Sequence, residues 1–349
     1  MKKILSAMMV MLLLVSLFTG CAKKDEAPAA TSDNSTKTEA TADTKTEEPA
    51  KEAEATGGKI VVGFSQCGAE SGWRTAETDS FKKTAEEDPD VELQFSDAQG
   101  QQENQIKAIR NFIAQGVDAI VLAPIVESGW DTVLQEAKDA GIPVFLVDRG
   151  VQVADESLYV TKIASDFIEE GKMAANYLIE KFGKDASLNI VELQGTVGAS
   201  AATDRKTGFE QGIEGLAGYK ITQSQTGDFA RAKGKEVMEA FLKSGEKIDV
   251  LYAHNDDMAV GAIQAIEEAG LKPGTDIVIV SIDGVKDIFQ AIADGKANCT
   301  VECTPLLAPQ TFQAIKDTLA GKTLDKWIKS NDRVFSDQAA IDELPNRVY

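Results

Sequence analysis

Along residues 59–349, short apolar runs rich in β-branched residues alternate with longer amphipathic stretches, and this alternation limits the possible folds more than any other feature of the chain. We interpret ten such runs as strands, at 60–64, 91–95, 119–122, 144–147, 158–160, 189–193, 220–222, 250–252, 277–282 and 299–301. Helical segments lie between most of them, for example at 73–87, 102–115, 127–140, 165–182 and 256–269.

Nearly continuous apolar strands separated by helices are typical of parallel sheets that helices cover on both faces. The N-terminal part of the 349 residues has a different composition, so the folded part begins only near residue 59. Ten strands are too many for one doubly wound sheet in a folded part of this length. We therefore predict an α/β fold with two lobes.

The N-terminus has the pattern of an export signal. Lys2 and Lys3 precede an apolar run over residues 8–18, which is too short to span a bilayer. The run ends in small residues directly before Cys21, and this ending resembles a bacterial lipobox. The resemblance implies removal of residues 1–20 as a lipoprotein signal peptide and acylation of the Cys21 thiol. An ordinary signal peptide with an incidental cysteine is the alternative.

Residues 22–58 contain no Val, Ile, Leu, Met, Phe, Trp, Tyr or Cys, so they have nothing to bury against the entropic cost of folding. We predict that residues 21–58 are an acylated cysteine followed by a disordered tether. Such an anchor implies that the folded part works outside the cytoplasm, at the outer face of a cell membrane, in a cell without a periplasm.

Several function classes are disfavoured. The net charge of −20 argues against a nucleic-acid partner, because phosphate contacts require clustered Lys and Arg. A phosphate-binding loop and a dinucleotide fingerprint are both missing. Without a Cys-x-x-Cys pair and with His254 as the single histidine, a metal site is not expected. We interpret His254 as a polar residue of a turn, and we predict no catalytic residues and no cofactor.

The cysteines of the folded part are Cys67, Cys299 and Cys303. Cys299 and Cys303 are four residues apart around a predicted strand, which separates them by about 13 Å and prevents a disulfide between them. We expect buried free thiols, and a pairing of one of them with Cys67 stays open.

Polar side chains cluster where the predicted strands end. In open α/β sheets ligands bind beyond the carboxyl ends of the strands, so these positions are candidate ligand contacts. The candidates are Glu70, Ser71, Gly72, Trp73, Arg74, Asp148, Arg149, Arg205, Asn255 and Asp283.

Each candidate also has a purely structural interpretation. Ser71 and Asn255 have the side chains that cap helix N-termini. Asp283 precedes a glycine and could form only a turn. Trp73 could be part of the core, and the pair 148–149 could be a surface ion pair.

The charges of the candidates indicate the kind of ligand. Three arginines face three carboxylates, namely Arg74, Arg149 and Arg205 against Glu70, Asp148 and Asp283. Such a balance suits a neutral, hydroxyl-rich molecule, because each hydroxyl donates to a carboxylate and accepts from a guanidinium or amide. An indole adds an apolar face for sugar C–H groups.

Several segments resemble the type I sugar-binding proteins of ABC importers, especially galactofuranose-binding proteins. They are VGFSQCGAESGWRTAE, QQENQIKAIRNFIAQGVDAIVLAP, GIPVFLVDRG, VELQGTVGASAATDRKTGF and YAHNDDMAVGAIQAIEEAGLKPG. The resemblance implies the type I periplasmic binding protein fold, with two Rossmann-like lobes joined by three hinge segments. It implies that the ten candidates contact a sugar held between the lobes.

The resemblance also implies lobe boundaries and partners. The N-terminal lobe would comprise residues 59–164 and about 304–330, and the C-terminal lobe 165–303 and about 331–349. The implied protein is a monomer that delivers a monosaccharide to an ABC permease. Phe167 and Cys303 depart from residues common in related proteins, so the exact sugar stays open.

Other functions stay open at this point. The closed form could instead be read by a chemoreceptor or sensor kinase. An enzyme is disfavoured because no nucleophile, base or metal set stands out. A repressor of this fold would need a DNA-binding headpiece where this chain has its signal and tether.

Overall fold

The computed structural model describes residues 58–349. The predicted signal peptide, the acylation site Cys21 and the tether through residue 57 lie outside the described residues. Among residues 58–349, none of the helices combines the length and the hydropathy that a membrane crossing requires.

The first six-stranded sheet has the order β11-β5-β4-β3-β1-β2, and all its strand pairs are parallel. Its strands are β1 (Ile60–Gln66), β2 (Val91–Asp97), β3 (Ala119–Leu122), β4 (Val144–Val147), β5 (Lys162–Ala164) and β11 (Trp327–Lys329). The helices of this part are α1 (Gly72–Glu87), α2 (Gln102–Gln115), α3 (Asp131–Asp139) and α9 (Ala308–Leu319). Two separate apolar clusters cover the sheet, one including Phe81 and Phe312 and the other including Phe112 and Trp130.

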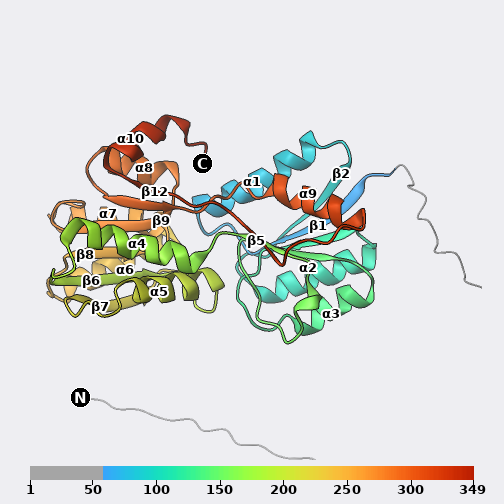
Figure 1. Cartoon of the computed structure of the whole chain (residues 1–349), viewed down its shortest axis with the longest axis horizontal. Coiled ribbons are helices and arrows are strands. Elements are labelled where there is room, and N and C mark those ends of the chain that lie inside the picture. Colours follow the sequence, from blue (N-terminus) through green and yellow to red (C-terminus); the bar gives the residue numbers. More distant parts are fainter. Residues whose placement is uncertain (1–57) are drawn as a thin grey trace, which may run out of the picture. The chain divides into compact units, whose positions relative to one another are not determined.

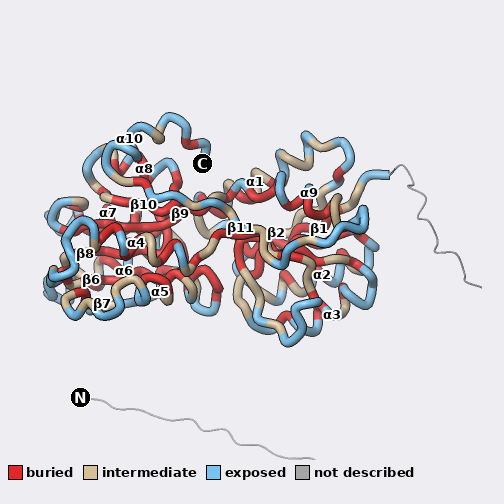
Figure 2. The backbone as a smooth tube through the Cα atoms, viewed as in Figure 1, coloured by how far each residue is buried: buried red, intermediate tan, exposed pale blue. Residues whose placement is uncertain are grey.

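The second sheet has the order β12-β10-β9-β8-β6-β7. Its strands are β6 (Leu188–Gln194), β7 (Tyr219–Thr226), β8 (Val250–Ala253), β9 (Val278–Asp283), β10 (Cys299–Glu302) and β12 (Val334–Ser336), of which β12 pairs antiparallel with β10. The helices are α4 (Phe167–Phe182), α5 (Ser200–Gly212), α6 (Arg231–Lys243), α7 (Asp256–Glu268), α8 (Lys286–Ala293) and α10 (Asp337–Glu343). Figure 1 shows these helices around their sheet, and Figure 2 shows that the inner strands, such as β9 and β10, are buried.

The chain passes between the two sheets three times, after β5, after β10 and between β11 and β12. The predicted fold class is therefore confirmed, with two parallel-sheet lobes and three connecting segments. Parallel strands place their carboxyl ends at one edge of each sheet, so this topology positions the polar residues that follow the strands.

Some predicted elements were wrong. No strand forms at 158–160, where one was expected: a 3-10 helix, η1 (Glu156–Leu158), extends into this range, and strand β5 begins only at Lys162. The Asp155 side chain accepts a hydrogen bond from the Ser157 N–H and so caps η1. This capped turn occupies the residues before the strand, which therefore begins later in the sequence than expected. The helix expected at 127–140 begins only at Asp131. The three-residue strands β11 and β12 were not predicted, because such short runs carry no periodicity.

The second lobe brings α4 and α5 unusually close together. A Cβ atom on Gly171 of α4 would lie 2.3 Å from the Arg205 carbonyl oxygen, and one on Gly208 of α5 would lie 2.0 Å from the Ile168 carbonyl oxygen. Both glycines are therefore needed for the two helix backbones to touch. This contact sets the position of Arg205 relative to the sheet.

Candidate functional site

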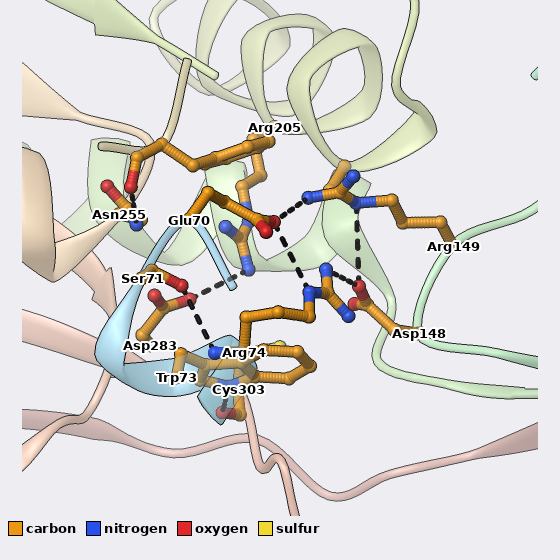
Figure 3. Close-up of a pocket in the computed structure, with 12 residues that line it drawn as sticks. Glu70, Ser71, Trp73, Arg74, Asp148, Arg149, Arg205, Asn255, Asp283 and Cys303 are labelled. Atoms are coloured by element: carbon orange, nitrogen blue, oxygen red, sulfur yellow. Dashed lines mark hydrogen bonds and ion pairs between the residues drawn. The ribbon is translucent and has the colours of Figure 1, made fainter. Parts of the chain in front are cut away.

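Nine of the ten predicted site residues line one cavity (Figure 3). They come from the turn after β1 and the start of α1, from the end of β4, from α5, and from the ends of β8 and β9. The full lining consists of Glu70, Ser71, Trp73, Arg74, Asp148, Arg149, Ala201, Arg205, Phe229, Asn255, Asp283 and Cys303. The predicted residue outside this lining is Gly72, whose N–H donates to Asp257 Oδ2 at 2.7 Å.

Arg74 is the centre of a carboxylate cluster in the first lobe. Its side chain is 2% exposed. Its Nε donates to Glu70 Oε1 at 3.2 Å, its Nη1 to Glu77 Oε2 at 2.5 Å and its Nη2 to Asp148 Oδ2 at 2.5 Å. Glu70 and Glu77 are four residues before and three residues after Arg74, so the start of α1 brings both within reach of one guanidinium.

Arg149 lies beside this cluster and keeps a free donor. Its Nη2 donates to Glu70 Oε1 at 3.0 Å, and its guanidinium lies 5.1 Å from the centroid of the Phe229 ring. The Nε atom is 3.5 Å from Asp148 Oδ2, and this buried nitrogen has no hydrogen-bond partner within the described residues. A buried N–H without a partner is costly, so a ligand oxygen at this point would be stabilised.

Arg205 is held in the second lobe by three groups. Its Nε donates to Glu170 Oε2 at 2.7 Å, its Nη1 to the His254 carbonyl oxygen at 2.6 Å, and its Nη2 to Asp283 Oδ1 at 3.4 Å. The geometry therefore aims the guanidinium at the end of β9.

His254 supports this arrangement from the end of β8. It is fully buried, its Nε2 lies 3.1 Å from Glu192 Oε1, and its Nδ1 accepts a hydrogen bond from the Gly195 N–H at 3.3 Å. Nε2 must then carry the proton that Glu192 accepts. Burial lowers the pKa of His254, while Glu192 opposes this shift. The side chain is a neutral structural group behind the cavity.

Trp73 contributes the apolar wall of the cavity. Its Nε1 donates to the Cys303 carbonyl oxygen at 2.5 Å, and the residue is 4% exposed.

The three cysteines Cys67, Cys299 and Cys303 are buried and free, as expected.

Two predicted residues combine capping with a place in the cavity. Ser71 Oγ accepts from the Arg74 N–H and caps α1, and Asn255 Oδ1 accepts from the Met258 N–H and caps α7. The Asn255 amide also donates to the Phe229 carbonyl oxygen at 3.0 Å. The structural and functional interpretations of these residues are therefore compatible.

Asp283 has an unusual backbone that a neighbouring carboxylate supports. Its φ angle is +130°, which side chains other than glycine rarely adopt. Asp256 accepts hydrogen bonds from the N–H groups of Gly284 at 2.6 Å and Val285 at 2.9 Å, and so it holds the turn that follows.

The predicted balance of three arginines and three carboxylates omits two further carboxyl groups that bind the same arginines. Glu77 and Glu170 are fully buried and bind Arg74 and Arg205. Burial raises the pKa of Glu77 to about 7 against the opposing effect of Arg74, and burial likewise raises the pKa of Glu170 against Arg205. Glu77 could have been found from its i,i+3 spacing to Arg74, whereas nothing in the sequence links Glu170 to Arg205.

Glu70 behaves differently from these two residues. Burial alone would raise its pKa, but the charges of Arg74 and Arg149 hold the pKa at about 2. Burial raises the pKa of Asp283 well above its usual range, while Arg205 opposes this. The site therefore mixes a firmly ionised carboxylate with carboxyl groups that can keep a proton.

Phe229, Ala201 and Cys303 line the cavity but were not predicted as site residues. Phe229 lies in the turn between β7 and α6, where it and Asp228 have left-handed φ angles of 61° and 51°. A Cβ atom on Gly195 would lie 1.9 Å from the Phe229 ring, so the ring packs directly on that glycine. Only the folded chain shows this contact.

In residues 58–349, no three His, Cys, Asp or Glu side chains are grouped so that they could hold a metal ion.

Comparisons with known proteins agree with this architecture. The family model of the periplasmic binding protein domain matches residues 62–323. The galactofuranose-binding protein YtfQ of Escherichia coli K12 is 52% identical over 293 residues, which are 82% of this chain and 91% of that protein. The fructose import binding protein FruE of Bifidobacterium longum is 36% identical and covers 83% of this chain and 88% of its own length.

Solved structures with the same fold include sugar complexes. A crystal structure of a galactofuranose binding protein has a TM-score of 0.80 at 52% identity and covers 82% of this chain and 98% of that one. The binding component of the arabinose ABC transporter from Shewanella sp. ANA-3, bound to α- and β-L-arabinofuranose, has a TM-score of 0.80 at 54% identity, with coverages of 82% and 95%. The chain therefore belongs to the periplasmic binding protein family, among the type I sugar-binding proteins of ABC transporters.

Proposed function

We propose that this protein captures a neutral monosaccharide, a galactofuranose-like hexose, between its two lobes and delivers it to an ABC permease. The observation that carries the proposal is a cavity lined by residues that follow strands of both sheets. Its walls combine guanidinium, carboxyl, amide and aromatic groups. The relatives that bind galactofuranose and arabinofuranose support the sugar class.

The lobes in this proposal are residues 59–164 with about 304–330, and residues 165–303 with about 331–349. The sheet order supports this division, because β1 to β5 and β11 share one sheet while β6 to β10 and β12 share the other. Each lobe contributes one side of the cavity, so a ligand can contact both only when they are closed.

We assign the sugar contacts to the nine predicted residues that line the cavity, with Phe229 added as a second aromatic wall. Asp148 and Asp283 would accept from hydroxyl groups, and the free Nε of Arg149 would donate to one. Hydrogen bonds to charged groups contribute about 1.5–3 kcal/mol each. A few of them, less the cost of immobilising the ligand, reach the roughly 8 kcal/mol of micromolar affinity.

The ionisation of the site favours an uncharged ligand. A sugar phosphate or a sugar acid would bring a further negative charge next to Glu70 and Asp148, and burying that charge without a new cation is costly. A neutral polyol needs only hydrogen bonds, which the partly satisfied arginines and carboxyl groups can supply.

The place of the protein in the cell is part of the proposal. Cleavage before Cys21 and acylation of its thiol would anchor a monomer to the outer face of the membrane, within reach of the permease. Metabolic labelling with a fatty acid tests this, because label should be incorporated by the native chain and not by the Cys21→Ala variant. Label that persists in the variant would contradict the anchor.

Isothermal titration with galactofuranose, galactose, arabinose and ribose tests the binding function. We expect micromolar affinity for at least one of them, and loss of at least a hundredfold in affinity for Arg149→Gln. Arg110→Gln is the matched control, since Arg110 is 52% exposed and pairs with Glu136 away from the cavity. An absence of heat at millimolar sugar would contradict the proposal, and recovery of chemically altered sugar after long incubation would indicate an enzyme instead.

A further inference from the structure

A backbone hydrogen bond joins the two lobes beside the cavity without lining it. The Gly72 N–H donates to Asp257 Oδ2 at 2.7 Å. Gly72 is the first residue of α1, which follows β1 in the first sheet, whereas Asp257 is in the first turn of α7, which follows β8 in the second. The bond therefore spans the two lobes.

The Asp257 carboxylate is oriented by its own lobe. Asp257 is 4% exposed, and its Oδ1 accepts from Arg231 Nε at 2.9 Å. Arg231 also donates to Asp287 Oδ2 at 2.7 Å, so its guanidinium bridges two carboxylates. This leaves Oδ2 of Asp257 directed at the other lobe.

The end of α1 is suited to receive this carboxylate. The positive end of a helix dipole favours a nearby anion, yet the first turn of this 16-residue helix contains no acidic residue. Ser71 caps the Arg74 N–H and leaves the Gly72 N–H for another acceptor. The anion that the helix lacks is supplied by the opposite lobe.

A charged contact across the proposed lobe boundary joins Lys329 Nζ and Asp166 Oδ2 at 2.7 Å, where the connecting segments run. Two hydrogen bonds between the lobes are made by neutral groups. The Gly150 N–H donates to Ser200 Oγ at 2.9 Å, and the Glu127 N–H donates to the Gly198 carbonyl oxygen at 2.8 Å. A bond to a carboxylate is roughly twice as strong as a neutral one. The contact at Gly72 is also the one next to Trp73 and Arg74, which line the cavity.

We propose that Asp257 is a positioning residue that latches the closed state, by binding the N-terminus of α1 once the lobes have come together around the sugar. It does not touch the sugar, since it lies outside the cavity lining. It holds the helix that carries Trp73 and Arg74 and so slows release. This inference rests on the proposed binding function.

Two variants remove the latch from opposite lobes. Asp257→Ala deletes the acceptor. Gly72→Pro replaces the donor N–H by a ring carbon at the first helical position, where proline is well tolerated after the extended Ser71. That carbon would also press against Asp257 Oδ2, so this variant removes the bond and hinders close approach of the carboxylate. Asp287→Asn is the matched control, because Asp287 binds the same arginine but is 57% exposed and, within residues 58–349, makes no hydrogen bond to the other lobe.

Stopped-flow tryptophan fluorescence on the purified full-length chain would give the association and dissociation rate constants for the sugar. A bond formed only after closure contributes to the closed state, so we expect each latch variant to release sugar about tenfold faster with association changed less than twofold. The double variant should release no faster than the more affected single variant, because both changes remove one interaction. Asp287→Asn should release sugar at the native rate.

The outcomes separate the latch from a merely structural role. Release rates within twofold of native for both latch variants, or additive effects in the double variant, would overturn the proposal. If Asp287→Asn accelerated sugar release equally, the effect would come from the position of Arg231, which both carboxylates bind. That result would also overturn the proposal. If Asp257→Ala does not fold, Asp257→Asn, which removes the charge and keeps the size of the side chain, decides in the same way. Native protein that binds no sugar would refute the proposed function rather than the latch.

Discussion

Replacing Arg74 by methionine tests how the charges of the cavity are balanced. The guanidinium binds Glu77 and Asp148, which are 0% and 5% exposed, whereas Glu70 would keep Arg149 at 3.0 Å. Methionine has a similar length and fills the space, so the change removes the charge and leaves little cavity. Removing one partner of a buried ion pair costs about 3–5 kcal/mol. We therefore expect Arg74→Met to lose about 4 kcal/mol of unfolding free energy at pH 8.

The loss should shrink on acidification. The pKa of Glu77 is already about 7 in the native fold and would rise further without Arg74, which lowers it, whereas in the unfolded chain it is near its ordinary value of 4.5. A carboxyl whose folded pKa is raised binds more protons in the folded state, so stability increases as the pH falls from the folded pKa toward 4.5. The increase is up to about 1.4 kcal/mol per pH unit for one group.

Urea unfolding followed by far-UV circular dichroism at pH 8 and pH 5 measures both effects. Adding Glu77→Gln to the Arg74→Met variant should restore about 2 kcal/mol at pH 8, because it removes the stranded charge. Arg110→Met is the control, since Arg110 is exposed, and its urea midpoint should match the native one at both pH values. An Arg74→Met loss that is equal at both pH values, or no rescue by Glu77→Gln, would refute this account of the charge balance.

Three further predictions concern the cavity walls and the connecting segments. Gly195→Ala should weaken sugar binding about tenfold by titration calorimetry, because its Cβ would lie 1.9 Å from the Phe229 ring and must displace it; unchanged affinity would contradict the role of Phe229. Trp73→Phe should lose both indole area and the hydrogen bond to the Cys303 carbonyl oxygen, and the same assay should show about a tenfold weaker affinity. Burial raises the pKa of Asp332 from 3.8 to about 7, so this group costs stability as the pH rises through that window. The melting temperature of Asp332→Asn should therefore fall less than that of the native chain between pH 4 and pH 7, and parallel curves would count against the buried carboxyl.

The position of the site followed from the sequence because the fold is parallel. Residues directly after apolar strands share one sheet edge in such a fold, and Asp148 follows β4 while Asn255 lies two residues beyond β8. These two residues line one cavity although they are over a hundred positions apart. Local rules also predicted that Asn255 caps a helix.

What the sequence did not reveal depends on contacts between distant segments. Glu170 reaches Arg205 only because α4 packs on α5, and Phe229 reaches the cavity from an irregular turn. The edge strand β7 was predicted as 220–222 but spans Tyr219–Thr226, since an edge strand tolerates polar residues such as Gln223 that mask its periodicity.

A crystal structure of the full-length chain grown with the tightest-binding sugar from the calorimetry tests the central claim most directly. We predict one uncharged sugar enclosed by residues of both lobes, in contact with Trp73, Arg149 and Asp283. Electron density for the sugar on the outside of a single lobe, or for an ionised ligand in the cavity, would contradict the account.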